Sequence, residues 1–244
     1  MSAPCLRSER LAAHGFAHGF FLRSVEPDWQ TACEALGVTR ENLFLLSQVH
    51  GRRVEVATAA DEPRSLRRRA GDVVVARQPG LACGTRVADC VPVLLACPTT
   101  GVVAAVHSGW RGTVLGAVLA GVEALRAEGA GPELCAAVGP HIEACCFEVG
   151  DEVAAELAAA TALGDAVIDR SRPKPHVDLR QVIAAQLAAV GVLAIDQVRG
   201  CTRCDAERFH SFRRDGAASG RMLGAIVARQ AEPVRSGGRL AFQG

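Results

Sequence analysis

Three residues with metal-binding side chains, His50, Cys90 and His107, each lie next to a short apolar run typical of a buried strand. Each is followed closely by a residue that turns the chain, namely Gly51, Pro92 and Gly109. Two imidazoles and one thiolate suit zinc, which prefers nitrogen and sulfur ligands in tetrahedral geometry. Three protein ligands leave one position for water, as in catalytic zinc sites. The spacing is not that of a compact zinc motif, so independent burial of the three residues remains an alternative.

Cys90 also supports a second interpretation, in which a cysteine nucleophile is paired with a histidine. The thiolate would attack the substrate, and His107 or His50 would act as the base. Asp89 would then orient a histidine or carry a proton. Equally, an aspartate at this position forms a turn by bonding its own backbone. The residue types leave both interpretations open.

The segment after His107 reads Ser108-Gly109-Trp110-Arg111-Gly112-Thr113 and runs into a helical pattern. A helix start presents free backbone N–H groups, and glycines allow a ligand to approach the backbone. Arg111 is therefore predicted to bind phosphate. Trp110 either stacks on a base or fills the core.

Ten cysteines occur in the chain. Four lie inside apolar patterns and are expected to be small core residues: Cys33, Cys83, Cys97 and Cys135. Four others, Cys145, Cys146, Cys201 and Cys204, would supply the thiolates of a structural zinc site. Vicinal cysteines are poor joint ligands, however, and only one CxxC is present. A redox pair of Cys201 and Cys204 is a further alternative.

A basic cluster near the end of the sequence has two interpretations. Arg213-Arg214-Asp215-Gly216 and Arg221 either bind an anionic ligand or form surface salt bridges around a turn.

Short strands mixed with helices must position these residues. The apolar runs 92–96 and 102–106, joined by a turn at 98–101, predict a hairpin that brings Cys90 and His107 to one end of a sheet. Further strands are expected at 16–22, 42–46, 54–56, 72–76, 81–87, 134–138 and 195–198, and helices at 29–36, 114–128, 151–163, 177–190 and 221–230. The pattern predicts one α+β domain over residues 1–244 with more than one sheet layer, in which about 232–244 form a loose tail.

Composition excludes several classes of protein. A formal net charge of +1 argues against a general nucleic-acid binder, which is usually markedly basic. The sequence has no apolar run long enough for a transmembrane helix, so we expect no membrane partner. The first twenty residues carry charges and histidines where a signal peptide needs an apolar stretch. We therefore expect a cytoplasmic protein; its oligomeric state is not encoded in these patterns.

Several motifs in order resemble those of the YfiH/YlmD-like family, which includes laccase-domain proteins. They are Gln48-Val49-His50-Gly51, Ala88-Asp89-Cys90-Val91-Pro92, His107-Ser108-Gly109-Trp110-Arg111-Gly112, Val138-Gly139-Pro140, Cys146-Phe147-Glu148-Val149-Gly150 and Arg213-Arg214-Asp215-Gly216. The resemblance extends from about residue 15 to 230. It implies a layered α/β/β/α fold with mixed sheets, related to cysteine hydrolases. It also implies a zinc ion held by His50, Cys90 and His107.

The implied activity is phosphorolysis of the purine nucleosides adenosine, inosine, guanosine and methylthioadenosine, together with zinc-assisted adenosine deamination. In that chemistry Arg111 would position phosphate, and Gln48 would hydrogen-bond the base or the ribose. An alternative within the family is peptidoglycan editing by hydrolysis of UDP-MurNAc-serine. A zinc-stabilised binding protein without catalysis is the non-enzyme alternative. Copper-dependent phenol oxidation is disfavoured because three such ligands do not supply several copper centres and no His-x-His pair occurs.

Overall fold

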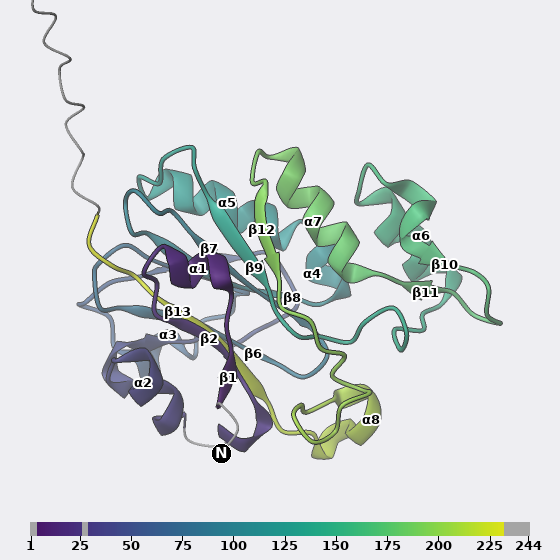
Figure 1. The fold of residues 1–244 in the computed structure, drawn as a ribbon, viewed down its shortest axis with the longest axis horizontal. Coiled ribbons are helices and arrows are strands. Elements are labelled where there is room, and N and C mark those ends of the chain that lie inside the picture. The colour runs from purple at the N-terminus through teal and green to yellow at the C-terminus, as the bar shows by residue number, and fades with distance from the viewer. Residues whose placement is uncertain (1–3, 26–28, 232–244) are drawn as a thin grey trace, which may run out of the picture.

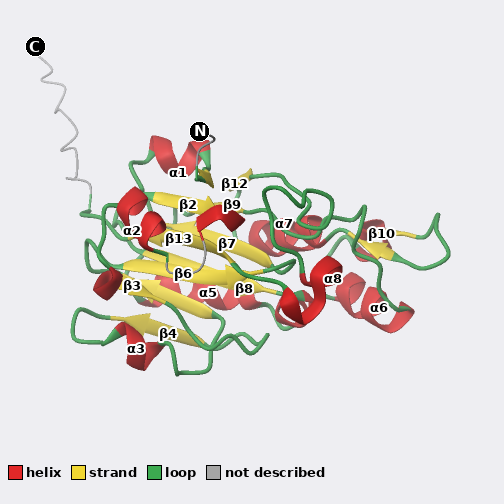
Figure 2. Ribbon diagram, turned by 90° about the horizontal axis from the view of Figure 1, so that it is seen from below, coloured by secondary structure: helices red, strands yellow, loops and turns green. Residues whose placement is uncertain are grey.

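The computed structural model describes residues 4–25 and 29–231 (Figure 1). Most of their strands belong to two sheets, and helices lie on both sides of these (Figures 1 and 2). The mixed α+β class with mixed sheets is confirmed. The tail expected at 232–244 lies outside the described residues. Among those residues no helix is long and apolar enough to cross a membrane.

The larger sheet carries the predicted hairpin. Within the described chain it has six strands in the order β12 (Ala194–Gln197), β9 (Cys135–Val138), β7 (Val91–Ala96), β8 (Val103–Ser108), β5 (Val73–Ala76) and β4 (Val54–Ala57). The outermost pair at each edge is parallel, and the other pairs are antiparallel. Pro92 pairs with His107 across the β7–β8 hairpin, which confirms that hairpin. The central strands are buried on both faces, which explains why their sequences are continuous apolar runs.

The second sheet joins segments from opposite parts of the sequence. As described, it has five strands in the order β1 (Cys5–Leu6), β2 (His18–Phe21), β13 (Met222–Val227), β6 (Ala82–Val87) and β3 (Leu43–Phe44). A separate short ribbon is formed by β10 (Ile168–Asp169) and β11 (His176–Val177).

The helices pack against both sheets and around their ends. They are α1 (Glu9–Ala13), α2 (Gln30–Leu36), α3 (Pro63–Leu66), α4 (Trp110–Val114), α5 (Ala117–Ala127), α6 (Asp151–Ala159), α7 (Leu179–Ala189) and α8 (Phe212–Asp215). One hydrophobic core joins the larger sheet to α5 and α7, for example through Val106, Val122 and Ile183. A second core joins the two sheets through residues such as Leu94 and Ile226. A third joins the smaller sheet to α2.

The prediction of a helix at 221–230 is wrong. Residues Met222–Val227 form the buried strand β13 between β2 and β6. Both faces of this strand are covered, so its sequence shows no alternation, and a short apolar run of this kind does not distinguish a strand from a buried helix.

The helix expected at 114–128 begins earlier and is interrupted. It divides into α4 and α5 at Gly116, whose φ of 75° lies in the left-handed region. The first piece, α4, begins at Trp110, just after β8 ends at Ser108. The four cysteines expected in the core, Cys33, Cys83, Cys97 and Cys135, are buried, which confirms that prediction.

Candidate active site and metal centre

Three of the predicted residues meet at one end of the larger sheet. His107 lies near the end of β8, Cys90 directly precedes β7, and His50 lies in the loop before β4. One ligand atom from each lies within 4.8 Å of the other two. The two imidazole rings are 4.9 Å apart between centroids, in an edge-to-face arrangement. The sheet thus assembles a sulfur and two nitrogens that are far apart in the sequence.

Asp72 organises both histidines. Its side chain, just before β5, is fully buried, and its Oδ1 lies 2.8 Å from Nδ1 of His107. The same carboxylate accepts the backbone N–H of His50 at 2.9 Å and that of Gly51 at 2.7 Å. His50 has a φ of 60°, a strained conformation for a residue other than glycine. The carboxylate therefore holds a strained turn in place and leaves Nε2 of His107 to bind a ligand.

Opposite charges in this cluster shift the pKa values of Cys90 and His107. Burial alone would raise the pKa of the Cys90 thiol, but the charge of His107 and hydrogen bonds from both histidines lower it to about 6. Burial alone would lower the pKa of His107, but Cys90 and Asp72 raise it to about 9. In the absence of a metal ion, these opposite shifts favour a thiolate beside an imidazolium. A metal ion must displace the imidazolium proton when it binds His107.

The cluster opens into a cavity of about 460 Å³. This volume suits a small-molecule ligand. Ile142 and Phe147 supply apolar lining. Three arginines also line it: Arg86, Arg213 and Arg221. The arginines make the cavity suitable for an anionic group.

Arg86 is the most strongly embedded of these arginines. Its Nε is buried and has no hydrogen-bond partner within the described chain. Burial, together with the nearby charges of Arg67 and Arg221, lowers its pKa. An unpaired buried N–H is costly.

The two residues predicted to bind substrate lie in different surroundings. Gln48 lines the cavity, but its side-chain amide is bonded to the backbone of Arg86, donating to the carbonyl at 2.7 Å and accepting from the N–H at 2.8 Å. Arg111 is exposed and does not line this cavity; its guanidinium lies 4.5 Å from the ring centroid of Trp110. Trp110 packs partly against the core.

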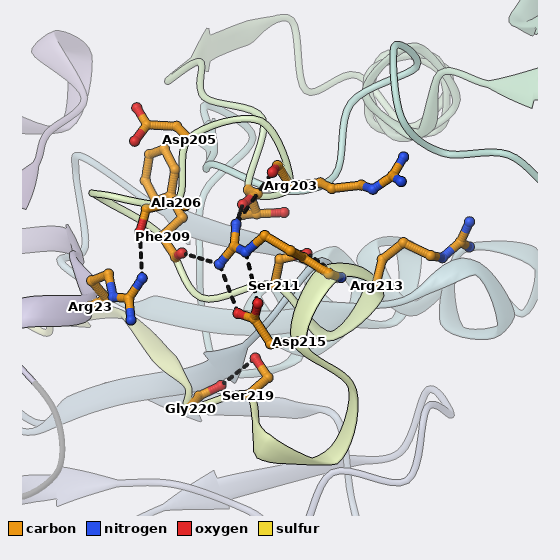
Figure 3. Close-up of polar contacts among 12 residues, drawn as sticks. Arg23, Arg203, Asp205, Ala206, Phe209, Ser211, Arg213, Asp215, Ser219 and Gly220 are labelled. Atoms are coloured by element: carbon orange, nitrogen blue, oxygen red, sulfur yellow. Dashed lines mark hydrogen bonds and ion pairs between the residues drawn. The ribbon is translucent and has the colours of Figure 1, made fainter.

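Asp89 connects loops around the cavity. Its Oδ1 accepts from Thr202 Oγ1 at 2.6 Å, and its Oδ2 accepts from the backbone N–H of Arg213 at 2.6 Å. Figure 3 shows the surroundings of Arg213, where Ser211 and Asp215 form the start and end of a short helical turn. Asp215 pairs with Arg214, as expected of a surface salt bridge, whereas Arg213 and Arg221 line the cavity.

Sequence reasoning did not identify the functions of Asp72 and Arg86. Each had a local signal. Asp72 is an acidic residue directly before an apolar strand, and Arg86 is a charged residue within one. A charged residue in a buried strand needs a partner or a ligand.

Gly109 provides a test of how tightly the cluster is packed. A Cβ at this position would lie 2.9 Å from Cys90 Sγ and 2.9 Å from His50 Cδ2. We expect Gly109→Ala to push these side chains apart and weaken metal binding by about 10- to 100-fold, the range for disturbed metal-site geometry. Isothermal titration with zinc measures this loss, and circular dichroism checks that the variant is folded. Unchanged affinity in a folded variant would show that the three side chains do not bind one ion.

Comparison with known proteins identifies the family. A family model described as multi-copper polyphenol oxidoreductase laccase matches residues 16–229. The chain belongs to this family. Laccase-domain relatives include a purine nucleoside phosphorylase of Streptomyces coelicolor, 38% identical over 83% of this chain and 82% of the relative. Another is an adenosine deaminase from an unknown prokaryotic organism, 39% identical over 82% of this chain and 80% of the relative.

Solved structures share the fold of this laccase-domain chain. YlmD from Geobacillus stearothermophilus aligns with a TM-score of 0.83 and 26% identity, over 94% of this chain and 98% of YlmD. The YfiH protein of Bacillus licheniformis aligns with a TM-score of 0.84 and 24% identity, over 93% and 97% of the two chains. The resemblance to the YfiH/YlmD-like family is thereby confirmed.

Proposed function

We propose that this protein is a zinc-dependent purine nucleoside phosphorylase that also deaminates adenosine. The observation that carries the proposal is the cluster of His50, Cys90 and His107 inside a cavity lined by arginines. Relatives named as a purine nucleoside phosphorylase and an adenosine deaminase support it. The proposed substrates are adenosine, inosine, guanosine and methylthioadenosine, with phosphate as co-substrate.

The donor set fits zinc. One thiolate and two imidazoles are typical zinc ligands, and their ligand atoms are close enough to share an ion. The low pKa of Cys90 supplies the deprotonated thiolate that a metal requires. A zinc ion held there would act as a Lewis acid toward water or the purine ring. Although the family is described as multi-copper laccases, three such ligands do not supply the several centres of a copper laccase.

The chain's own residues would orient both substrates. Arg213, Arg221 and Arg86 would hold the phosphate by charge-assisted hydrogen bonds near the ribose carbon that it attacks. Gln48 fixes the backbone of Arg86 and so acts mainly as a positioning residue. Phe147 and Ile142 would contact the apolar face of the base and exclude water. Phosphate binding by Arg111 remains a competing prediction.

Comparing the two proposed activities tests the phosphate site independently of the rest of the cavity. Phosphorolysis consumes phosphate, whereas deamination consumes water. We expect Arg213→Gln to raise the KM for phosphate by about 10- to 100-fold, because a charge-assisted hydrogen bond contributes about 1.5–3 kcal/mol. The kcat/KM for adenosine deamination should stay within a few-fold of wild type. Steady-state assays of both reactions check this split.

Arg111→Gln is the matched comparison for that experiment. If Arg111→Gln raises the KM for phosphate while Arg213→Gln does not, the cavity arginines are not the phosphate site and the original prediction for Arg111 holds.

The thiolate–imidazolium pair favours a second candidate function. Cysteine hydrolases use such a pair for acyl transfer, so Cys90 and His107 would also suit peptidoglycan editing by hydrolysis of UDP-MurNAc-serine. Separate incubations with purine nucleosides plus phosphate, and with UDP-MurNAc-serine, distinguish the two. Consumption of neither, with a loss of thermal stability on metal removal, would indicate a zinc-stabilised binding protein.

We also propose the α/β/β/α order of layers. Three hydrophobic cores support it: one between α5, α7 and the larger sheet, one between the two sheets, and one between the smaller sheet and α2. A relationship to cysteine hydrolases, a single domain and cytoplasmic residence remain predictions.

A further inference from the structure

A second group of metal-ligating side chains lies outside the catalytic cluster. The sulfur atoms of Cys145, Cys146, Cys201 and Cys204 all lie within 4.8 Å of one another. Sγ of Cys204 is 3.7 Å from that of Cys145 and 3.3 Å from that of Cys146. Sulfur ligands of a tetrahedral zinc ion lie about 3.8 Å apart, since each zinc–sulfur bond is about 2.3 Å long. We propose that these four thiolates form a second, structural zinc site.

The backbone brings the two cysteine pairs together. The 141–146 segment turns back on itself, with the N–H of Cys146 donating to the carbonyl of Glu143 at 2.8 Å. The 200–205 segment makes its own turn, in which the N–H of Asp205 donates to the carbonyl of Cys201 at 3.2 Å. Two hydrogen bonds of His141 join the segments, one to Gly200 O at 3.2 Å and one from Thr202 N at 3.0 Å. The site is therefore assembled by the fold.

This geometry answers the objection to vicinal ligands. Adjacent cysteines are poor joint ligands when an extended backbone directs them to opposite sides. Here the turn places the sulfurs of both Cys145 and Cys146 within 4 Å of Cys204. The CxxC turn supplies the remaining ligand, Cys201, which is buried. Four sulfurs with no fifth position match the closed arrangement of structural zinc sites.

Nearby guanidinium groups suit the charge of such a site. Zinc binding displaces one proton from each of the four thiols and leaves a net charge of −2. Arg172 donates to the carbonyl of Cys145 at 2.9 Å. Arg214 donates to the carbonyls of Thr202 and Arg203, at 2.9 and 3.3 Å, within the CxxC loop. These positive charges thus contact the backbone of the two loops that carry the cysteines.

A zinc ion here would hold together two loops that border the catalytic cavity. Ile142 and Phe147, which line the cavity, flank the first cysteine pair in the sequence. Thr202, between the second pair, donates to Asp89 at 2.6 Å, next to Cys90. The four-cysteine site thus joins two loops that both border the catalytic centre, and its proposed role is structural rather than catalytic.

The metal content of a Cys90→Ala background tests this site independently of the proposed function. We expect Cys90→Ala protein, reconstituted with zinc, to hold about one equivalent through the four cysteines. The triple variant with Cys145→Ser and Cys204→Ser should hold none. Cys90→Ala with Cys97→Ser is the matched control and should keep its zinc; Cys97 has polar neighbours in Thr99 and Gly131 that accommodate a hydroxyl. Absence of zinc from Cys90→Ala protein would overturn the site, whatever the fate of nucleoside turnover.

Two measurements on the wild-type chain keep the proposal testable if the triple variant does not fold. Cobalt substitution should give the intense ligand-field and thiolate charge-transfer bands of a four-thiolate tetrahedral centre. Zinc should slow alkylation of the exposed Cys204 by at least about tenfold, because only a free thiolate attacks the reagent. A mass lower by two hydrogens, restored by reductant, would reveal a disulfide among these cysteines and overturn the zinc assignment in favour of a redox pair. Unchanged alkylation would also overturn it.

Discussion

Replacing Cys90 with alanine is expected to abolish metal binding at the catalytic cluster together with both nucleoside activities. The side chain is the only thiolate among the three proposed ligands, and its negative charge also favours the imidazolium of His107. Loss of a direct ligand should exceed the roughly 100-fold effect of disturbing an outer partner. Metal analysis by mass spectrometry and assays of phosphorolysis and deamination check this. Metal at the four-cysteine site is counted separately.

Cys83→Ala is the matched control for that variant. Cys83 is a buried thiol in β6, and burial raises its pKa far above its usual range, so it remains a neutral core residue. We expect the control to keep its metal and its turnover. Nucleoside turnover by Cys90→Ala protein that has lost the catalytic metal would refute zinc-dependent catalysis.

Asp72→Asn is expected to damage both stability and the metal centre. The carboxylate accepts from His107, and from the backbone N–H groups of His50 and Gly51. An amide of the same shape has one oxygen, so its NH₂ group must face a donor. Breaking a buried ion pair on one side costs about 3–5 kcal/mol of unfolding free energy. Losing the orienting partner of a ligand should weaken metal binding by about 10- to 100-fold.

The pH dependence of stability provides a further check on Asp72. Burial alone would raise the pKa of this carboxyl, but hydrogen bonding to His107 and the backbone outweighs it and holds the pKa below its ordinary value of 3.8. A depressed folded-state pKa stabilises the protein above the ordinary value, and this contribution is lost as the pH falls through the folded-state pKa. Denaturant titrations from pH 7 downward should therefore show a shallower acid loss in Asp72→Asn than in wild type.

Asp151→Asn serves as the control for Asp72→Asn. Asp151 is an exposed carboxylate paired with Arg170 on the surface, where an ion pair contributes less than about 1 kcal/mol. If the Asp72 and Asp151 variants lose similar amounts of stability and metal affinity, Asp72 does not organise the site.

Sequence patterns predicted the parts of the site that depend on local chemistry. The hairpin followed from two apolar runs and a turn, and it correctly placed Cys90 near His107. The position of Asp72 depends on the antiparallel pairing of β5 with β8, which aligns segments distant in the sequence. Its partnership with His107 therefore has no local signature. The sequence offered Arg213 and Arg221 as an anion-binding cluster, but it did not show that they share a cavity with Arg86, because Arg86 lies in β6 and Arg213 in α8, far apart in the sequence.

The largest error in the fold has a different physical cause. An apolar run such as Met222–Val227 satisfies a buried strand and a buried helix equally, and only its neighbours decide. Vicinal cysteines show the same limitation. Whether Cys145 and Cys146 can share a ligand depends on a backbone turn that the residue types do not reveal.

The position of β13 has a consequence for how the protein is made. This strand fills the gap between β2 and β6, yet the ribosome synthesises it long after both of them. Until it arrives, β2 and β6 expose unpaired backbone edges, and such edges promote association with other chains. Pairing over so great a sequence separation also slows folding. The facing edges of β2 and β6 therefore stay unpaired while residues 88–221 are synthesised. Chaperones would protect the nascent chain from aggregation during this period.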